Sequence, residues 1–238
     1  MLSLDRVQAF YGASQVLHGV SLTVRPGEIV SLLGRNGAGR STTLKAVMGL
    51  LPWRGSIAWR GVSLAGRRPH EVARLGLGYV PEDRQVFPDL TVHHNLLLGE
   101  KPRRWRAGAA GRAPRWSIAD VYRMFPRLHE RRDAPAAVLS GGEQQMLTLG
   151  RTLVGDPELV MVDEPTEGLA PMLVEQVGQT LRQLAAAGVG VLLVEQKLAI
   201  ALAVADRCLV MGRGEVVFDG SPQALAADAA LRREWLEV

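Results

Sequence analysis

The feature that most constrains this chain is a glycine-rich loop at Gly34–Thr42, which reads GRNGAGRST. The loop follows the largely apolar run Glu28–Leu33 and precedes a segment, about Ser41 to Leu50, with helical character. Glycines allow backbone conformations that other residues avoid, so successive N–H groups can point inward and surround an anion. The N-terminus of a following helix adds partial positive charge. The pattern predicts a strand, a phosphate-binding loop and a helix, in that order.

The loop matches the P-loop pattern G-x-x-x-x-G-K-[ST] at every position except one. Ser41 is placed to bind Mg²⁺ through its hydroxyl. Arg40 replaces the lysine, and its planar, forked guanidinium is larger than a compact ammonium. We therefore expect nucleotide binding to survive and hydrolysis at this site to be weakened. The candidate phosphate-binding residues are Gly34, Arg35, Asn36, Gly37, Ala38, Gly39, Arg40, Ser41 and Thr42.

Strand-like and helix-like segments alternate along the chain, which favours an α/β fold. Strands are expected at Leu2–Val7, Ser21–Val24, Glu28–Leu33, Gly55–Arg60, Leu77–Val80, Leu159–Val162, Val189–Val194, Arg207–Met211 and Glu215–Phe218. Helices are expected at Ser41–Leu50, Gly142–Leu153, Met172–Ala187, Leu198–Ala205 and in the tail from Ser221.

Between residues 91 and 135 the pattern changes to helical periodicity, seen in Thr91–Leu98 and Ile118–Leu128. We interpret residues 91–135 as an inserted helical lobe, and residues 1–90 and 136–238 as the α/β core. The length of 238 residues fits a single domain of this kind. No internal repeat is visible, which excludes a second copy of the domain within this sequence.

Two neighbouring acids, Asp163 and Glu164, end the apolar run Leu159–Val162. Ligands of open α/β sheets bind where strands end, so these carboxylates are expected near the phosphate loop. Asp163 suits the coordination shell of Mg²⁺. Glu164 is the candidate general base that polarises an attacking water.

A third motif, LSGGEQQ at Leu139–Gln145, lies between the loop and the acids. Ser140 and Glu143 fit a capping box, which predicts a helix that begins here. With the P-loop upstream and the acidic strand just downstream, the chain resembles the ABC ATPases along nearly its whole length. That resemblance implies a P-loop NTPase core of ABC type, with an N-terminal antiparallel β subdomain and an inserted helical subdomain. It also implies ATP and Mg²⁺ as cofactors and ATP hydrolysis as the activity.

The resemblance assigns roles to further residues. Tyr11 matches the aromatic residue that stacks on adenine. Ser140, Gly141 and Gly142 match the signature that closes over the γ-phosphate of ATP bound by a partner subunit. Leu169–Pro171 lies where the family has its dimer-contact loop.

Two positions depart from most relatives. Glu82, in YVPE, stands where most have a glutamine that senses Mg²⁺ and the membrane subunit. Gln196, in VEQ, stands where most have the histidine beside the γ-phosphate. Because an amide does not carry a proton charge, Gln196 is not expected to act as a histidine would.

With these departures and the segments EGLAP and FPDLTV, the chain resembles one of the two unequal ATPase subunits of branched-chain amino acid importers. The resemblance implies a different second ATPase subunit, two transmembrane permease subunits and, indirectly, an extracytoplasmic solute-binding protein. Urea and short-amide importers are close alternatives, so the solute stays open. In a head-to-tail pair, this chain's P-loop would form a weak site, and its signature would serve the partner's competent site.

The sequence composition indicates the cellular compartment in which we expect the chain to function. The purest apolar run, Leu198–Ala205, is far shorter than the roughly 18 residues that span a bilayer, and the N-terminus shows no signal-peptide pattern. A lone cysteine, Cys208, excludes an internal disulfide and suits a reducing compartment. We expect a peripheral location on the cytoplasmic face of the inner membrane, reached only through partners.

The net charge of +4 is unevenly placed, since residues 101–132 hold ten Lys/Arg against two Asp/Glu. Such a segment can bind nucleic-acid or lipid phosphates, but no interleaved aromatic residues support nucleic-acid binding, and a solvated surface segment is favoured. The role of 101–117 is open. Two other functions are considered for the chain. It could be a subunit that binds nucleotide without hydrolysing it, or a subunit of an exporter.

Overall fold

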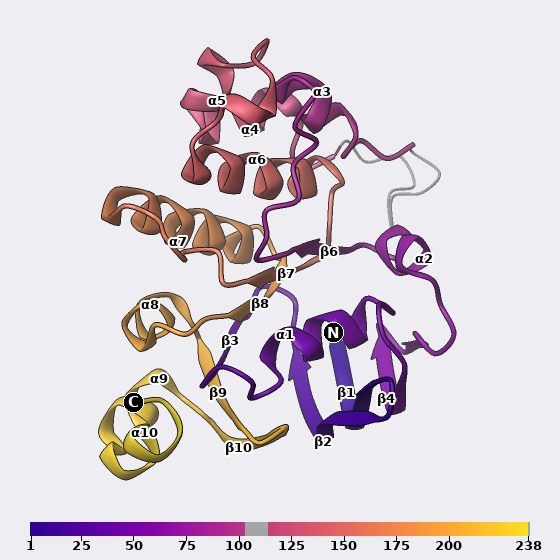
Figure 1. The fold of residues 1–238 in the computed structure, drawn as a ribbon, viewed down its shortest axis with the longest axis vertical. Helices are drawn as coiled ribbons and strands as arrows, with labels where there is room; N and C mark the ends of the chain where they lie inside the picture. The colour runs from indigo at the N-terminus through magenta and orange to yellow at the C-terminus, as the bar shows by residue number, and fades with distance from the viewer. Residues whose placement is uncertain (103–113, 238) are drawn as a thin grey trace.

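The computed structural model describes residues 1–102 and 114–237 and contains two β-sheets and several helices (Figure 1). Residues 103–113, which carry much of the basic segment, lie outside the described part. The four-stranded antiparallel sheet has the order β2-β1-β4-β5. Its strands are β1 (Leu2–Tyr11), β2 (Ser14–Val24), β4 (Trp53–Trp59) and β5 (Val62–Ser63).

The six-stranded sheet has the order β10-β9-β3-β8-β7-β6. Its strands are β3 (Ile29–Gly34), β6 (Leu77–Val80), β7 (Leu159–Asp163), β8 (Gly190–Val194), β9 (Arg207–Gly212) and β10 (Glu215–Gly220). β10 pairs antiparallel with β9, whereas the described pairings among the other strands are parallel. Parallel strands end at the same edge, so the residues that follow β3, β7 and β8 come together there.

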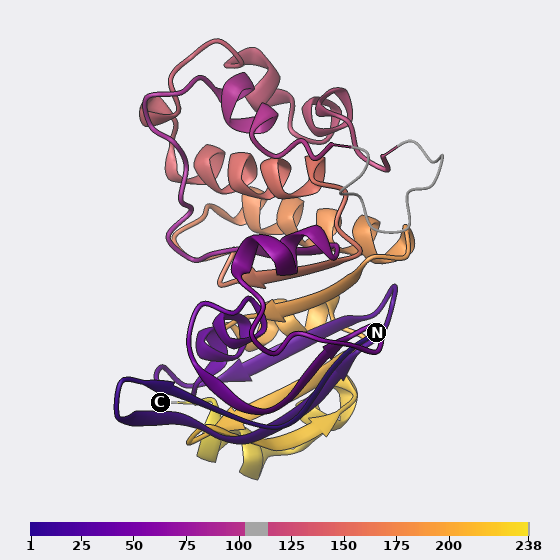
Figure 2. The ribbon, with the colours of Figure 1, turned by 90° about the vertical axis from the view of Figure 1, so that its right-hand side faces the viewer.

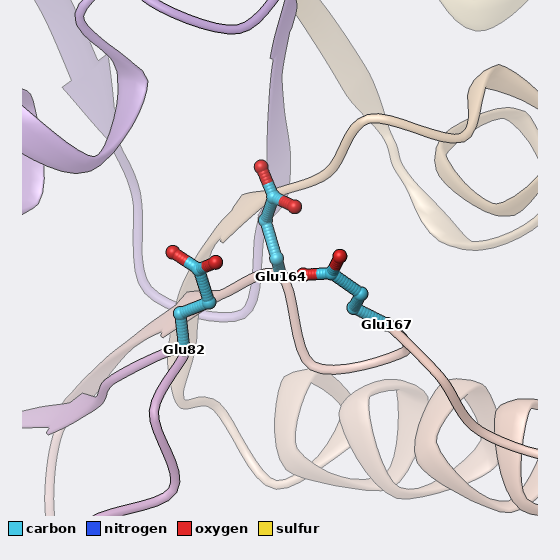
Figure 3. Close-up of side chains that lie close together, drawn as sticks. All are labelled: Glu82, Glu164 and Glu167. Atoms are coloured by element: carbon cyan, nitrogen blue, oxygen red, sulfur yellow. The ribbon is translucent and has the colours of Figure 1, made fainter.

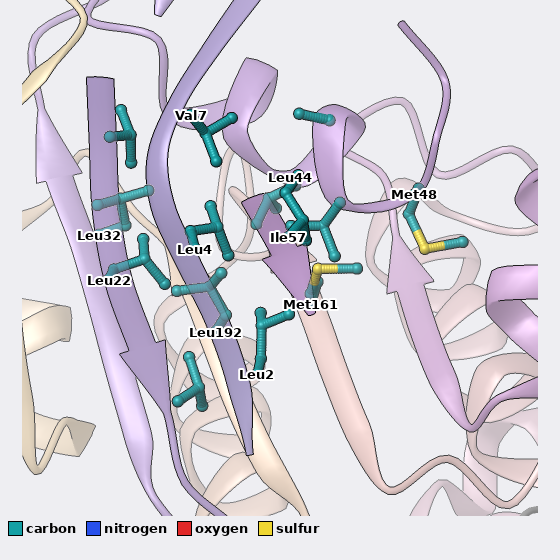
Figure 4. Packing of buried hydrophobic residues seen from close by; sticks show 14 of the residues in the cluster. Leu2, Leu4, Val7, Leu22, Leu32, Leu44, Met48, Ile57, Met161 and Leu192 are labelled. Atoms are coloured by element: carbon teal, nitrogen blue, oxygen red, sulfur yellow. The ribbon is translucent and has the colours of Figure 1, made fainter. Parts of the chain in front are cut away.

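The parallel strands are mostly apolar because both of their faces are covered. In β7, Leu159 and Met161 face the core that lies between the two sheets, and Val160 and Val162 face the core under the helices. Figure 4 shows Met161 on the inter-sheet side, packed among residues of β1, β4 and α1. This two-sided burial explains why the core strands are largely hydrophobic runs rather than alternating ones.

Helices cover both faces of the six-stranded sheet. The helices are α1 (Arg40–Val47), α2 (Pro69–Arg74), α3 (Val92–Leu97), α4 (Ile118–Met124), α5 (Pro126–Glu130), α6 (Gly141–Val154), α7 (Pro171–Ala186), α8 (Leu198–Val204), α9 (Pro222–Ala227) and α10 (Ala229–Trp235). α1 packs between the sheets, while α6 and α7 lie on the opposite side and α3, α4 and α5 pack on α6 (Figures 1 and 2). Within residues 1–102 and 114–237, no helix is both long enough and apolar enough to cross a membrane.

The predicted α/β fold with an antiparallel sheet is confirmed, but several element bounds differ. The expected strands Leu2–Val7 and Ser21–Val24 are the paired ends of one long hairpin, β1 and β2. A bulge interrupts the alternation of β1, with Arg6 at φ 48°. Such a bulge hides a two-residue period from sequence reading.

Other differences concern helices. The expected single helix Ile118–Leu128 is two helices, because Phe125 precedes Pro126 and takes φ −129° and ψ 75°. A residue before proline is disfavoured in the α conformation. α2 was not expected, and the tail forms two short helices, α9 and α10, rather than one.

Candidate nucleotide site

The glycine-rich loop connects β3 to α1, as its sequence predicts. Gly34 ends β3 at φ 153°, and a Cβ there would meet the carbonyl oxygen of Met211 at 2.6 Å. Gly39 precedes α1 at φ 99°, where a Cβ would lie 2.7 Å from Leu17 Cδ2. Both positions therefore require glycine for conformation and for space.

The loop and the acidic strand end meet through Ser41 and Asp163. The Ser41 hydroxyl donates to Asp163 Oδ1 at 2.9 Å, although the residues are 122 positions apart. Tyr79, on β6, donates to the other oxygen, Oδ2, at 3.3 Å. Burial raises the pKa of the Asp163 carboxyl, and the hydrogen bond from Ser41 lowers it in part. Burial, then the charge of Asp163, raises the pKa of the Tyr79 hydroxyl, so this group stays a protonated donor.

Glu164 directly follows β7 and pairs with Arg40. Arg40 Nη2 lies 2.7 Å from Glu164 Oε1, and the two side chains are only 5% and 11% exposed. The backbone N–H of Glu164 donates to the carbonyl of Val194 on β8 at 3.0 Å. Its φ of 44° is unusual for a residue other than glycine. Burial raises the pKa of the Glu164 carboxyl, while the Arg40 charge lowers it in part.

Three glutamates converge beside the loop (Figure 3). Glu82, Glu164 and Glu167 each place a carboxylate oxygen within 4.8 Å of the others. Glu164 is intermediate in exposure and the other two are exposed. The concentration of negative charge fits a site that holds a cation or faces a basic group.

A cavity of about 310 Å³ beside the phosphate loop, the loop cavity, is lined by most of the predicted residues. Its lining includes Asn36, Gly37, Gly39, Arg40, Ser41, Thr42, Glu82, Glu164, Glu167 and Gln196. Gln196 reaches this place because β8 ends beside β7 and β3. Just before it, Glu195 is buried and accepts a hydrogen bond from the Thr166 hydroxyl at 2.7 Å.

The remaining predicted residues lie elsewhere. Gly34 and Ala38 shape the loop but do not line the cavity. Arg35 is exposed and donates to the backbone carbonyls of Arg233 and Glu237 near the C-terminus. Tyr11, at the end of β1, has an exposed fraction of 49% and is not part of the cavity lining.

The signature segment forms the N-terminus of α6. Ser140 accepts from the backbone N–H of Glu143, and the Glu143 carboxylate accepts from the backbone N–H of Ser140 at 2.8 Å. The predicted capping box is thus confirmed. Ser140, Gly141 and Gly142 do not line the loop cavity in this single chain.

Sequence reasoning missed two residues at the site. The motifs YVPE and EGLAP contain Tyr79 and Glu167, but the sequence assigned neither residue a role. Tyr79 was recognisable as a polar residue inside an apolar edge strand, and Glu167 as an acid three residues beyond Glu164.

A larger cavity of about 1,100 Å³ adjoins the acids. Its lining includes the acids Asp163, Glu164 and Glu82 together with the apolar side chains of Phe87 and Leu98. Phe87 and Leu98 are themselves exposed. The groove therefore joins the acidic site to the region of α3.

Several known proteins are similar to this chain in sequence or in fold. The sequence model of the ABC transporter family matches residues 17–167. The high-affinity branched-chain amino acid transport ATP-binding protein BraG of Pseudomonas aeruginosa is 41% identical and covers 99% of both chains. The Nod factor export ATP-binding protein I of Burkholderia orbicola is 37% identical over 94% of this chain and 72% of its own.

A solved structure, the nucleotide-free ATP-binding cassette from an ABC transporter, has the same fold, with a TM-score of 0.81 and 24% identity. The match covers 97% of this chain and 96% of that cassette. The family match spans the loop, the signature and the acidic strand end that the structure assembles. The chain therefore belongs to the ABC transporter family.

Proposed function

We propose that this chain binds ATP with Mg²⁺ in the 310 Å³ cavity and, because Arg40 replaces the P-loop lysine, hydrolyses it only weakly as one ATPase subunit of a transporter. The observation that carries the proposal is the junction of Ser41 and Asp163, at 2.9 Å, beside Glu164. It joins the phosphate loop to the acidic end of β7. The loop supplies backbone N–H groups and a helix N-terminus for phosphate.

The residues at this junction fit Mg²⁺. Ser41 offers a hydroxyl oxygen and Asp163 a carboxylate oxygen, and Mg²⁺ prefers hard oxygen ligands. We assign both as ligands, with Glu82 close by on the loop after β6. When bound, the ion would neutralise charge on the phosphates.

Glu164 is the proposed general base, which accepts a proton from the attacking water. Gln196 lines the same cavity and can orient that water or a phosphate oxygen by hydrogen bonding. Arg40 supplies positive charge to the phosphates. We assign Tyr11 to stacking on adenine.

We further propose that two ATPase subunits associate head to tail. Ser140, Gly141 and Gly142 then close over nucleotide held by the partner, because the capped N-terminus of α6 is an anion-binding end. The partner is a different ATPase subunit, and the pair docks on two transmembrane permease subunits. This assembly places the chain on the cytoplasmic face of the inner membrane.

The proposed solute is a branched-chain amino acid, taken up by import. The end-to-end 41% identity to BraG supports this solute and direction. A urea or short-amide importer is an alternative. The 37% identity to a Nod factor export protein keeps an exporter as a further one. Uptake of labelled leucine and urea by vesicles that contain the assembled transporter separates these solutes.

The test of the ATPase is MgATP binding and phosphate release by the wild type and Glu164→Gln. Each is measured alone and with the partner ATPase and permease subunits. If the wild type binds ATP, turns over only in the complex, and Glu164→Gln leaves much of that turnover, this chain chiefly donates its signature. If the wild type hydrolyses ATP well alone and Glu164→Gln abolishes this, Arg40 substitutes for lysine and the weak-site account is wrong.

A further inference from the structure

Arg40 is held inside the phosphate loop by groups of the protein itself. A single nitrogen, Nη2, contacts Glu164 Oε1 at 2.7 Å and donates to Asn36 Oδ1 at 3.1 Å. Because both Arg40 and Glu164 are nearly buried, solvent screens this ion pair little. The guanidinium of Arg40, which lines the loop cavity, is thus already paired with the Glu164 carboxylate of the same chain.

The second terminal nitrogen of Arg40 is in a different position. Nη1 is buried and has no hydrogen-bond partner among the described residues. A buried donor on a charged group is costly when it is left unpaired. Arg40 lines the loop cavity together with Gly37 and Thr42, so a phosphate oxygen that enters the cavity can pair with Nη1.

Arginine grips phosphate best with two nitrogens at once, in a bidentate arrangement. Here one of the two is already engaged by Glu164. A phosphate that takes both nitrogens must displace the Glu164 carboxylate. Until then, the ion pair holds that carboxylate on Arg40.

We propose that Arg40 is a positioning residue for Glu164: it sequesters the carboxylate in the nucleotide-free chain, and bound phosphate competes for the guanidinium and releases it. The inference rests on the proposed nucleotide site.

The test is a double-mutant cycle on ATP affinity, measured with the isolated full-length chain by titrating a fluorescent ATP analogue with Mg²⁺. Glu164→Gln is made in the wild-type and Arg40→Met backgrounds. Any Glu164 carboxylate repels ATP, so some gain in affinity is expected in both. Only with Arg40 present does the substitution also remove a competitor, and there the gain should be about tenfold larger.

Glu167→Gln is the charge-matched comparison, because the Glu167 carboxylate lies within 4.8 Å of the Glu164 carboxylate. Its gain should be the same in both backgrounds. Circular dichroism checks folding, and Arg40→Gln replaces Arg40→Met if the latter does not fold. Equal gains from Glu164→Gln in both backgrounds overturn the competition. If the wild type binds no ATP, the proposed nucleotide site itself fails.

Discussion

At the scale of single residues, the substitution of arginine for lysine at position 40 has the most direct consequence for catalysis. Lysine has one compact donor group, which cannot hold a carboxylate and a phosphate in the forked manner of arginine. We expect Arg40→Lys to raise phosphate release at this chain's own site about tenfold, equivalent to ~1.4 kcal/mol in the barrier. Phosphate release by the isolated chain and by the assembled transporter measures the gain.

Transport itself should change little in Arg40→Lys, because the proposed competent site belongs to the partner's P-loop. Arg127→Lys is a suitable control, since Arg127 is exposed and pairs only with a neighbouring surface acid in the described contacts. A large gain in transport from Arg40→Lys would contradict the assignment of this site as the weak one.

The pKa of Asp163 leads to a prediction about pH. Burial raises this pKa in the folded chain, so the folded state holds the proton to higher pH than the unfolded state does. The contribution of Asp163 to unfolding free energy is therefore greatest below its unfolded pKa and falls as pH rises through the folded pKa. Asp163→Asn does not titrate, and its partners Ser41 and Tyr79 are hydroxyls that can accept as well as donate.

We therefore expect the unfolding free energy of Asp163→Asn, relative to wild type, to increase from pH 4 to pH 7. Urea unfolding without nucleotide or Mg²⁺ at the two pH values measures this difference. A difference that is constant or decreases with pH would show that burial does not disfavour the Asp163 carboxylate. The absolute stability of each protein is not needed for the comparison.

The residues of the site could be predicted to a considerable extent. Ser41 and Asp163 were assigned to one metal from their motifs, and the structure places them in hydrogen-bond contact. The pairing of Arg40 with Glu164 could not be predicted, because it depends on rotamers and on how β3 and β7 end on either side of β8. The proposed ligand roles stay predictions.

At the scale of elements, the capping box of α6 combines a structural role with a proposed functional one. Ser140→Ala removes a side-chain cap and should cost about 1 kcal/mol in unfolding free energy. Ser117, which caps α4 with the same box geometry, provides the matched control. If Ser140 also contacts the partner's nucleotide, only Ser140→Ala should lower ATPase activity of the complex, by about tenfold.

Urea unfolding of the two isolated variants and phosphate release by the two complexes separate these roles. Equal losses of activity would mean that Ser140 acts only as a cap. Activity lost in Ser140→Ala alone, at similar stability, supports the shared nucleotide site.

Elements were predictable where one physical cause dominates. Two-sided burial makes β3, β7 and β8 apolar, and each was located from sequence to within a residue or two. β1 and β2 were underestimated because the residues nearest the hairpin turn, Gln8–Tyr11 and Ser14–Val20, become strands through pairing across the hairpin and with β4, which local propensity does not encode. The break between α4 and α5 was predictable from Pro126, because the residue before a proline is disfavoured in the α conformation.

At the scale of the whole molecule, the candidate nucleotide site and the helices packed on α6 meet at one edge of the six-stranded sheet. Parallel strands bring the phosphate loop, the acids and Gln196 together, while α3, α4 and α5 pack on α6 above them. The assignment of residues 91–135 as a separate lobe stays a prediction. These helices thus pack against the helix whose N-terminus carries the signature segment.

The 1,100 Å³ groove between the acids and α3 is the surface that we expect to contact the permease. Leu98 lies on its wall, with an exposed fraction of 55%. Leu98→Asp should weaken assembly with the permease subunits by about tenfold, because a carboxylate buried at the interface would lose its hydration. ATP binding by the isolated chain should not change, since Leu98 is not among the residues that line the loop cavity.

Val62→Asp is the control, because Val62 is similarly exposed, at 41%, but lies on β5 of the other sheet. Co-purification with tagged permease subunits, alongside ATP titration of each isolated variant, measures both effects. We expect Val62→Asp to assemble as the wild type does. If Leu98→Asp also assembles normally, the groove is not the docking surface, and the coupling of ATP hydrolysis to transport must be transmitted through another face of the chain.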